Sequence, residues 1–391
     1  MKNDAAKIAY IRQLCCMGLG SRVIMPRLLH AVRSLVASDS AGFFWIDARG
    51  EMRNFYAERT LSPQATAEFW RHYDDGDAPF RRLFLARASA AEPISTVSVN
   101  KTLERTSYYQ NVLRELEADH VLHAIVRDPV NGFGQLSLYR PRSARPFSPA
   151  DRQAIKRVLH YIAHAIAAHD RPGSEAMGRP QFVDSDIEAL LIVRGNGDIE
   201  HASGAGRHLL LMAAGDNVNP STIAGGAVGA KALLERLHQE VVAVYRGREA
   251  APAPPRRFIE NAWGRFALRS YALSDNPLAR DARFAVHITR QEPALLKLAE
   301  AVRCFPLSPQ QAEVALLLAR GLTNADIAER MNVSLNTASY HVKQLFMKLD
   351  VHNRQEALRR LSEAQPACPE GGDRPRSRSA ELVIRSGLRE E

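Results

Sequence analysis

The chain has 391 residues, of which 46% are hydrophobic and 24% are charged, which is ordinary for a globular protein and predicts two or three domains. Four scattered cysteines argue against a secreted disulfide framework, and no apolar run approaches the ~18 residues of a membrane helix, so we expect a cytoplasmic protein with no membrane partner. The net charge of +9 allows a polyanionic partner but does not establish one.

The N-terminal part of the chain predicts an α+β domain. Apolar residues recur at threes and fours from Ile8 to Ser38, which predicts helix. Two β-rich segments follow, each with turn residues in its middle, at 47–50 and 129–132, and both predict hairpins. A closing helix is expected from Ser148, an N-cap residue with Asp151 in the first turn.

This order of helix, hairpin, hairpin and helix resembles a GAF domain, especially in the strand Gly134–Leu138 and the F-S-x-x-D motif at Phe147–Asp151. The resemblance implies a sensory domain over residues 1–170. Phe43, Trp45 and Tyr56 are candidates for lining a small-molecule pocket there, but they can equally fill the core.

A second sensory region is expected after a polar linker at 171–181. Residues 189–213 run as strand, Gly-Asn-Gly turn, strand and leucine-rich helix, and two later apolar runs at 265–273 and 283–291 supply further strands. This plan resembles a PAS domain, which we place at 182–290. Its strand Leu191–Val193 is the second candidate pocket wall.

The remaining segments are a connector, an output domain and a tail. Residues 291–302 are expected to form a connecting helix with Leu295, Leu298 and Val302 on one face. The last segment, 366–391, is rich in Pro, Gly, Ser and charge, which predicts disorder.

Four short helices are expected between 303 and 365. Each begins with a capping residue, at Ser308, Thr323, Ser334 and Asn353, and Gly321 ends the first of them. The second and third helices are joined by a tight turn. This is the arrangement of a helix-turn-helix, whose second helix lies in the DNA major groove.

The third helix has two contrasting stripes. One is apolar and is expected to be buried: Ala338, Val342, Leu345 and Leu349. The other carries donors and acceptors that suit base edges and phosphates: Asn336, Tyr340, Lys343 and Met347, with Ser339 beside them. The alternative is the solvated face of an ordinary bundle helix.

The motif G-L-T-N-x-x-I-A-E followed by V-S-x-N-T-x-x-x-H-V and F-x-K-L-x-V-x-x-R-x-E-A resembles the LuxR-type (GerE-like) helix-turn-helix domain. The resemblance implies a multidomain DNA-binding transcriptional regulator, with α+β sensory domains followed by an all-α four-helix output domain. The candidate DNA-binding residues are Thr323, Asn324, Ser334, Asn336, Thr337, Ser339, Tyr340, Lys343 and Met347.

One position departs from the family pattern. Ser339 stands where the family has a basic residue, so a sensory or scaffold protein that no longer binds DNA is the alternative function. Eight Lys/Arg against five Asp/Glu between Arg303 and Leu361 give few phosphate contacts, which favours a homodimer on double-stranded DNA. A small-molecule ligand and RNA polymerase are the other partners that this architecture allows.

Signals for enzymatic chemistry are weak. The glycine-rich stretch Gly225–Lys231 lacks the Gly-Lys-[Ser/Thr] of a phosphate loop. His160 and His164 share a helix face, but the pattern lacks the Glu of a metalloprotease helix. We therefore expect no catalytic residues, no metal and no cofactor, and we expect that the protein is not an enzyme.

Overall fold

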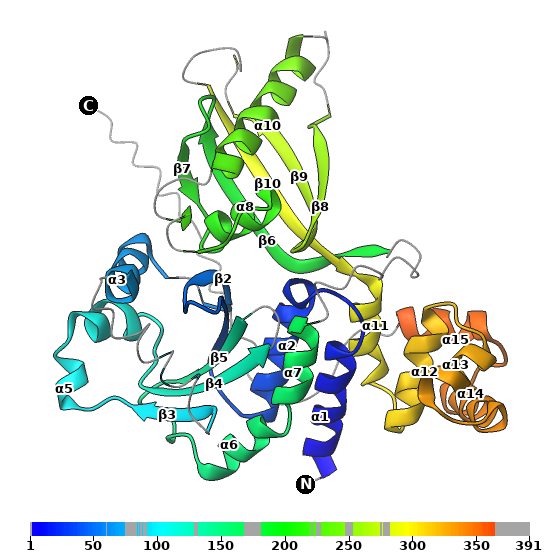
Figure 1. Cartoon of the computed structure of the whole chain (residues 1–391). Helices are drawn as coiled ribbons and strands as arrows, with labels where there is room; N and C mark the ends of the chain where they lie inside the picture. Colours follow the sequence, from blue (N-terminus) through cyan, green and yellow to red (C-terminus); the bar gives the residue numbers. More distant parts are fainter. Residues whose placement is uncertain are drawn as a thin grey trace, which may run out of the picture.

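The computed structural model describes residues 2–59, 61–74, 84, 86, 88, 92–128, 132–167, 181–219, 222–223, 228–246, 253–273, 276 and 282–363. Two α+β domains, each built on a five-stranded antiparallel sheet, are followed by a helical C-terminal domain (Figure 1). The multidomain fold class expected from the sequence is confirmed. The linker at 171–180 and the tail at 366–391 lie outside the described residues.

The first domain begins with two helices and then forms its sheet. Its elements are α1 (Lys2–Cys15), α2 (Ser21–Leu35), β1 (Ser40–Ile46), β2 (Met52–Ala57), α3 (Pro63–Asp74), β3 (Ile94–Ser98), α5 (Lys101–Glu104), the π-helical turn η1 (Tyr109–Leu113), β4 (His120–Asp128), β5 (Gly132–Arg140), α6 (Pro149–Lys156) and α7 (Leu159–Ala167). The sheet order is β2-β1-β5-β4-β3.

Both predicted hairpins of this domain are present, but the helices differ from the prediction. The single helix expected from Ile8 to Ser38 is two helices, because the chain turns between them at Gly18, which has φ +71°. The closing helix is also two, α6 and α7; its start is confirmed by a capping box between Ser148 and Asp151. The sequence patterns did not predict α3, β3, α5 or η1.

The second domain repeats the plan of the first sheet. Its elements are β6 (Phe182–Arg194), β7 (Ile199–Ala202), α8 (Gly206–Ala214), α10 (Val228–Arg246), β8 (Arg256–Asn261), β9 (Gly264–Ala272) and β10 (Arg283–Pro293), with the sheet order β7-β6-β10-β9-β8. Counted within each domain, both sheets run second, first, fifth, fourth, third. The long helix α10, part of which lies in the glycine-rich stretch, and the strand β8 were not predicted.

The candidate pocket residues named from the sequence lie in the core. Phe43 is 1% exposed, and a side chain at Gly134 would collide with its ring and with Ile166 of α7. Trp45 donates from its indole to Ser21 of α2. Leu191 and Val193 are fully buried in the second domain. Of the two alternatives that the sequence left open, these residues take the core one, and Tyr56 is half-buried and packs against the same core.

The two sheets meet along buried polar and aromatic contacts. The rings of Trp45 and Trp263 stack edge to face with centroids 5.6 Å apart. Asn54, which is 1% exposed, accepts from the backbone N–H of Val218, and the Phe55 N–H donates to the Val218 carbonyl at 2.8 Å. These two hydrogen bonds and the ring contact therefore join the first two domains.

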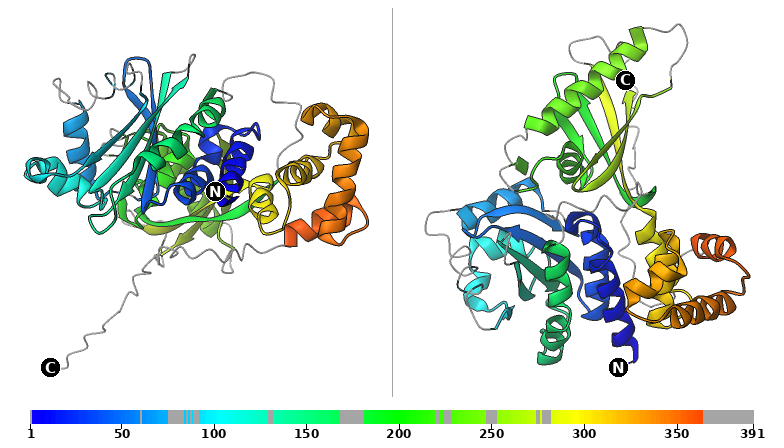
Figure 2. Two further views of the ribbon diagram at one scale, coloured as in Figure 1. Left: turned by 90° about the horizontal axis from the view of Figure 1, so that it is seen from below. Right: turned by 45° about the vertical axis from the view of Figure 1, so that its right-hand side comes forward.

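The connecting helix α11 follows the second sheet without a loop. Strand β10 ends at Pro293, and α11 (Ala294–Val302) starts at the next residue. The connecting helix is thus shorter than predicted, and Leu296 rather than Leu295 or Leu298 is its fully buried leucine. Helix α1 lies beside α11, between the first sheet and the C-terminal domain (Figures 1 and 2).

The last domain contains α12 (Pro309–Ala319), α13 (Asn324–Met331), α14 (Leu335–Leu349) and α15 (Arg354–Glu363). No helix in the described part of the chain is both long enough and apolar enough to cross a membrane.

Candidate nucleic-acid interface

The predicted caps set the boundaries of the output helices. Ser308 and Thr323 each form a reciprocal capping box, with Gln311 and Asp326. The Ser334 hydroxyl accepts from the backbone N–H of Thr337. Gly321 ends α12 with φ +85°, a conformation that a side chain disfavours. All four helix starts predicted from the sequence are therefore confirmed, since the Asn353 side chain also accepts from the Glu356 N–H.

Helix α14 packs on α12, α13 and α15 through one stripe. Its four predicted core residues, Ala338, Val342, Leu345 and Leu349, are at most 7% exposed. The opposite stripe is open: Tyr340 is 59% and Met347 66% exposed, and Asn336 and Lys343 are also exposed. This contrast means that packing within the domain leaves the polar stripe of α14 free to meet another molecule.

The other candidate DNA-binding residues divide into capping and bridging groups. Thr323 and Ser334 hold the starts of α13 and α14, so their hydroxyls are engaged inside the domain. Thr337 is exposed, and its hydroxyl is 2.9 Å from that of Ser334. The Asn324 amide donates to the half-buried Ser339 hydroxyl at 3.4 Å, which joins the first turn of α13 to α14.

Two basic residues that the resemblance marked as family positions have structural roles. The Arg354 guanidinium donates to the carbonyls of Leu318 and Leu322, which satisfies backbone acceptors at the end of α12. The Lys348 ammonium donates to the Pro306 carbonyl at 2.7 Å. Both cations therefore brace the domain, and Lys343 is the exposed cation in the middle of the α14 stripe.

One exposed residue of α14 was missed. Leu335 is 53% exposed, although it lies three residues before the buried Ala338. Its spacing from Ala338 assigns Leu335 to the core stripe. However, Leu335 is the first residue of α14, where the helix has not yet reached the helices on which it packs. Its side chain therefore adds an apolar group to the exposed face, of the kind that contacts thymine methyl groups.

The fourth helix buries its apolar face inside the domain. Ala357 and Leu361 are each 1% exposed and face inward, where α15 packs on α11, α12 and α14. The apolar face of α15 is therefore covered by the chain's own helices.

Local hydrogen bonds lower the pKa of two carboxylates near the interface. The Thr323 hydroxyl and backbone N–H, both donating to the Asp326 carboxylate, lower the pKa of that group. The His352 N–H likewise lowers the pKa of Glu356. Both carboxylates therefore stay ionised as helix caps, at the N-terminal ends where negative charge is favourable.

The comparisons with known proteins concern mainly this domain. The profile of the family described as "Bacterial regulatory proteins, luxR family" (GerE) matches residues 306–361. The probable transcriptional regulatory protein SgaR of Hyphomicrobium methylovorum is 44% identical over 52 residues, which are 13% of this chain and 25% of that protein. The two-component response regulator PprB of Pseudomonas aeruginosa is 40% identical over 58 residues, 15% of this chain and 21% of PprB.

The Vibrio campbellii regulator MalT is 29% identical over 86 residues, 22% of this chain and 10% of MalT. Each alignment thus covers a quarter or less of the relative's own length. Among solved structures, a phycoerythrobilin-bound GAF domain from a cyanobacterial phytochrome covers 42% of this chain and 95% of its own, with 15% identity and a TM-score of 0.31. Escherichia coli SdiA covers 88% of this chain and 90% of its own, with 11% identity and a TM-score of 0.25.

The capped helices, the turn between α13 and α14 and the family profile all fall on the same residues. Residues 306–361 of this chain are therefore a helix-turn-helix domain of the luxR family.

Proposed function

We propose that the protein is a cytoplasmic, homodimeric, DNA-binding transcriptional regulator. Residues 1–170 and 182–290 are its sensory domains, and residues 303–365 are its output domain. The observation that carries the proposal is the exposed polar stripe of α14, which stands opposite a fully packed core stripe. RNA polymerase belongs among its partners because a regulator bound at a promoter acts on transcription through that enzyme.

The stripe contains the groups that major-groove recognition uses. An Asn amide such as that of Asn336 can pair with adenine, and the Tyr340 hydroxyl can donate to a base or a phosphate. The Lys343 ammonium can pair with a phosphate of the DNA backbone. Thr337 and the free backbone N–H groups at the start of α14 suit a phosphate oxygen.

Ion pairs connect the first domain to the segment that leads into this output domain. Arg27 of α2 binds Glu292 at the end of β10 and Glu300 on α11. The first domain therefore contacts both elements that meet at the joint, the boundary between β10 and α11. A second ion pair joins Arg12 of α1 to Glu313 of α12 at 3.1 Å. A signal that binds one arrangement of these helices more tightly than another would shift the position of α14.

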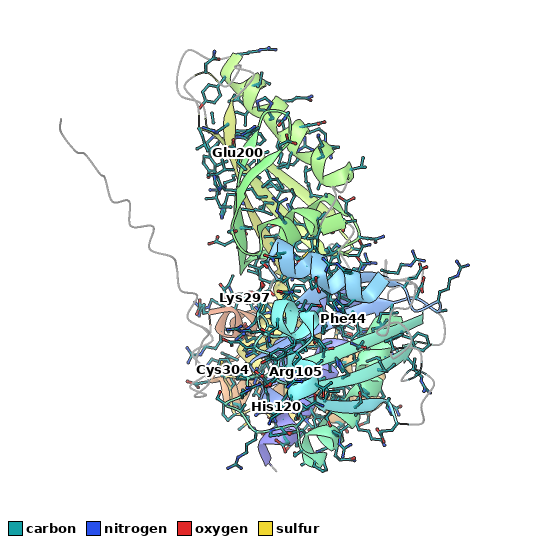
Figure 3. All side chains as sticks on the ribbon, turned by 90° about the vertical axis from the view of Figure 1, so that its left-hand side faces the viewer. Phe44, Arg105, His120, Glu200, Lys297 and Cys304 are labelled. Atoms are coloured by element: carbon teal, nitrogen blue, oxygen red, sulfur yellow. The ribbon has the colours of Figure 1, made fainter. Side chains whose placement is uncertain are left out.

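Replacing Lys343 with alanine is expected to weaken binding to all duplexes about equally. Loss of one phosphate contact per half-site should reduce the slope of log K against log salt by about 0.9 per half-site. A fluorescence-anisotropy titration over several salt concentrations measures this slope. Lys297→Ala is the matched control, because Lys297 is an exposed lysine on α11 (labelled in Figure 3). A slope that is unchanged in Lys343→Ala would show that the α14 stripe does not face DNA.

The alternative is a scaffold that does not bind DNA. It is motivated by Ser339, which is hydrogen-bonded to Asn324 and carries no positive charge. A gel-shift assay of the full chain with genomic fragments at low salt separates the two functions. If some fragments stay bound when competitor DNA of random sequence is added, the result supports the regulator. Complete failure to retain DNA at about 50 mM salt, where the electrostatic contribution is strong, would favour the scaffold.

The DNA-bound species is expected to contain two chains. One output domain has few exposed cations, whereas two domains on half-sites one helical turn apart double the phosphate contacts. Sedimentation of the complex should therefore give a protein mass of twice 43.4 kDa. A complex with a single chain, at concentrations that protect the operator, would contradict the dimer.

A further inference from the structure

The sheet of the second domain has one covered face and one open face. Helices α8 and α10 pack on the same face (Figure 1), and side chains that point toward them, such as Leu191 and Phe284, are at most 1% exposed. Side chains alternate along a strand, so the residues between these point to the opposite face. There Leu190, Phe258 and Tyr271 are 48%, 44% and 36% exposed. The described parts of the chain therefore leave an apolar surface open, and such surfaces mark binding sites.

The register of the strands arranges this open face in rows. One row crosses four strands, through Leu190 of β6, His287 of β10, Arg269 of β9 and Arg256 of β8. The next row consists, in the same order of strands, of Glu188, Thr289, Ala267 and Phe258. Strand β10 is thus the middle strand of the open face, with β6 on one side and β9 and β8 on the other.

The two sides of the open face carry mainly opposite charges. The β6 side has three exposed acids: Asp184, Asp186 and Glu188. The other side has three basic residues on β9 and β8, Arg256, Arg265 and Arg269, and one acid, Glu260. At the far end of the face, Arg194 and Arg283 both pair with Glu200 (labelled in Figure 3). The face is therefore acidic along β6 and basic along β9 and β8.

The arginines of the basic side are held in place but are not neutralised. Arg256 and Arg269 lie directly opposite each other, an arrangement in which like charges destabilise a sheet, and no carboxylate of the described residues forms an ion pair with either. Arg256 and Arg265 both lie over the Phe258 ring, with Cζ 4.6 and 4.5 Å from its centroid. A carboxylate from another molecule would relieve the repulsion between these cations.

A second copy of the same face supplies such carboxylates. Two faces can stack about a two-fold axis parallel to β10, which places β6 of each chain over β9 of its partner at the same level along the strands. Glu188 then lies against the basic side of the other chain, between Arg265 and Arg269. In the same way Ile192 meets Tyr271. Stacked sheets lie about 10 Å apart, a gap that an arginine and a carboxylate side chain span together.

An axis in the plane of contact but perpendicular to β10 does not give this match. It would place β6 over β6, so the acidic sides of the two chains would meet, and contacts between like charges are costly. It would also make the two β10 strands run in opposite directions. The axis parallel to β10 keeps both strands running the same way, and α11 follows β10 directly, so both output domains leave from the same end of the dimer. Two output domains at one end can occupy neighbouring half-sites of one duplex.

We propose that the open face of the second sheet binds the same face of a second copy of this chain, about a two-fold axis parallel to β10. The proposal rests on the homodimer of the proposed function and adds the surface that forms it. It is tested on the full chain in the absence of DNA. A dimer that forms on DNA without this surface would refute the proposal and leave the proposed function standing.

The test is the association constant of the free chain, measured by sedimentation equilibrium. Arg269→Glu sets an acid against Glu188 of the other copy, and Glu188→Arg sets a base against Arg269. Each change occurs twice in a two-fold dimer, so each single variant should dimerise at least about 10-fold more weakly than wild type. Arg236→Glu is the matched control, because this exposed arginine lies on α10, on the covered side of the sheet. Its association constant should equal that of wild type.

An equimolar mixture of Arg269→Glu and Glu188→Arg should recover dimers of mixed composition, since both contacts then join opposite charges. Native mass spectrometry identifies these dimers by mass, and their recovery also shows that both variants are folded. A wild-type chain that stays monomeric without DNA would overturn the proposal, as would single variants that associate as tightly as wild type. Weakened single variants whose mixture stays monomeric would overturn the axis parallel to β10.

Discussion

Replacing Arg27 with leucine is expected to lower the free energy of unfolding by about 3 kcal/mol. The Arg27 side chain is only 23% exposed, and Nε and Nη2 both bind the Glu292 carboxylate, whose side chain is 6% exposed. Nη1 binds Glu300. The neighbouring carboxylates raise the pKa of Arg27, because they favour its charged form. Removal of the cation leaves a buried carboxylate without a counter-charge, which is the costly way to break an ion pair. Urea unfolding followed by tryptophan fluorescence measures the loss.

The matched control is Arg12→Leu. That arginine also joins an N-terminal helix to the C-terminal part of the chain, but it and Glu313 are 42% and 38% exposed. Solvent screening limits such a pair to under about 1 kcal/mol. Adding Glu292→Gln to Arg27→Leu should recover part of the stability, since the uncompensated charge is removed. If Arg27→Leu costs no more than Arg12→Leu, the contact at the joint is not a structural link between α2 and α11.

His208→Phe is expected to make the protein less sensitive to acid. An unfolded histidine binds its proton near pH 6.5, whereas burial lowers the pKa of folded His208 to about 4. Between these values the unfolded chain holds a proton that the folded protein does not, so stability falls as the pH decreases through this window. From pH 7 to pH 5 the loss due to His208 amounts to about 2 kcal/mol.

The measurement is the free energy of unfolding at pH 7 and pH 5 for wild type and variant. Wild type should lose about 2 kcal/mol more than His208→Phe over this interval, because all other titrating groups are shared. His201→Phe serves as the control, since it makes the same substitution at an exposed histidine on β7. Equal losses in wild type and His208→Phe would mean that His208 is protonated in the folded protein near pH 5.

Two side-chain contacts tie the first domain to the rest of the chain: Arg27 of α2 pairs with Glu292 and Glu300, and Phe55 of β2 meets His208 of α8. Each of these two contacts connects the first domain to the part of the chain that ends in α11. The His208–Phe55 contact and the Arg27 ion pairs are therefore parts of one packed connection. Coupling between them requires that two arrangements of this connection differ in ligand affinity.

The sequence by itself determined the output domain. Caps, the glycine after α12 and the apolar stripe of α14 depend on residues three or four apart, so each is visible in a short window. The same is true of the first hairpin, where β1 and β2 join at a short turn. Local signals of this kind do not depend on what the rest of the chain does, which is why these predictions are confirmed.

Only the tertiary structure decided which residues fill the core and which meet at the joint. The run Ala41–Ile46 is apolar on both faces, so its sequence does not tell which face packs against the helices, and Phe43 and Trp45 were candidates for a pocket wall as well as for the core. His208 reaches β2 from a helix more than 150 residues away, and Arg27 meets Glu292 across 265 positions. Such pairs form only when the two domains pack against each other. The periodicity of either segment by itself therefore does not indicate which residue its partner will be.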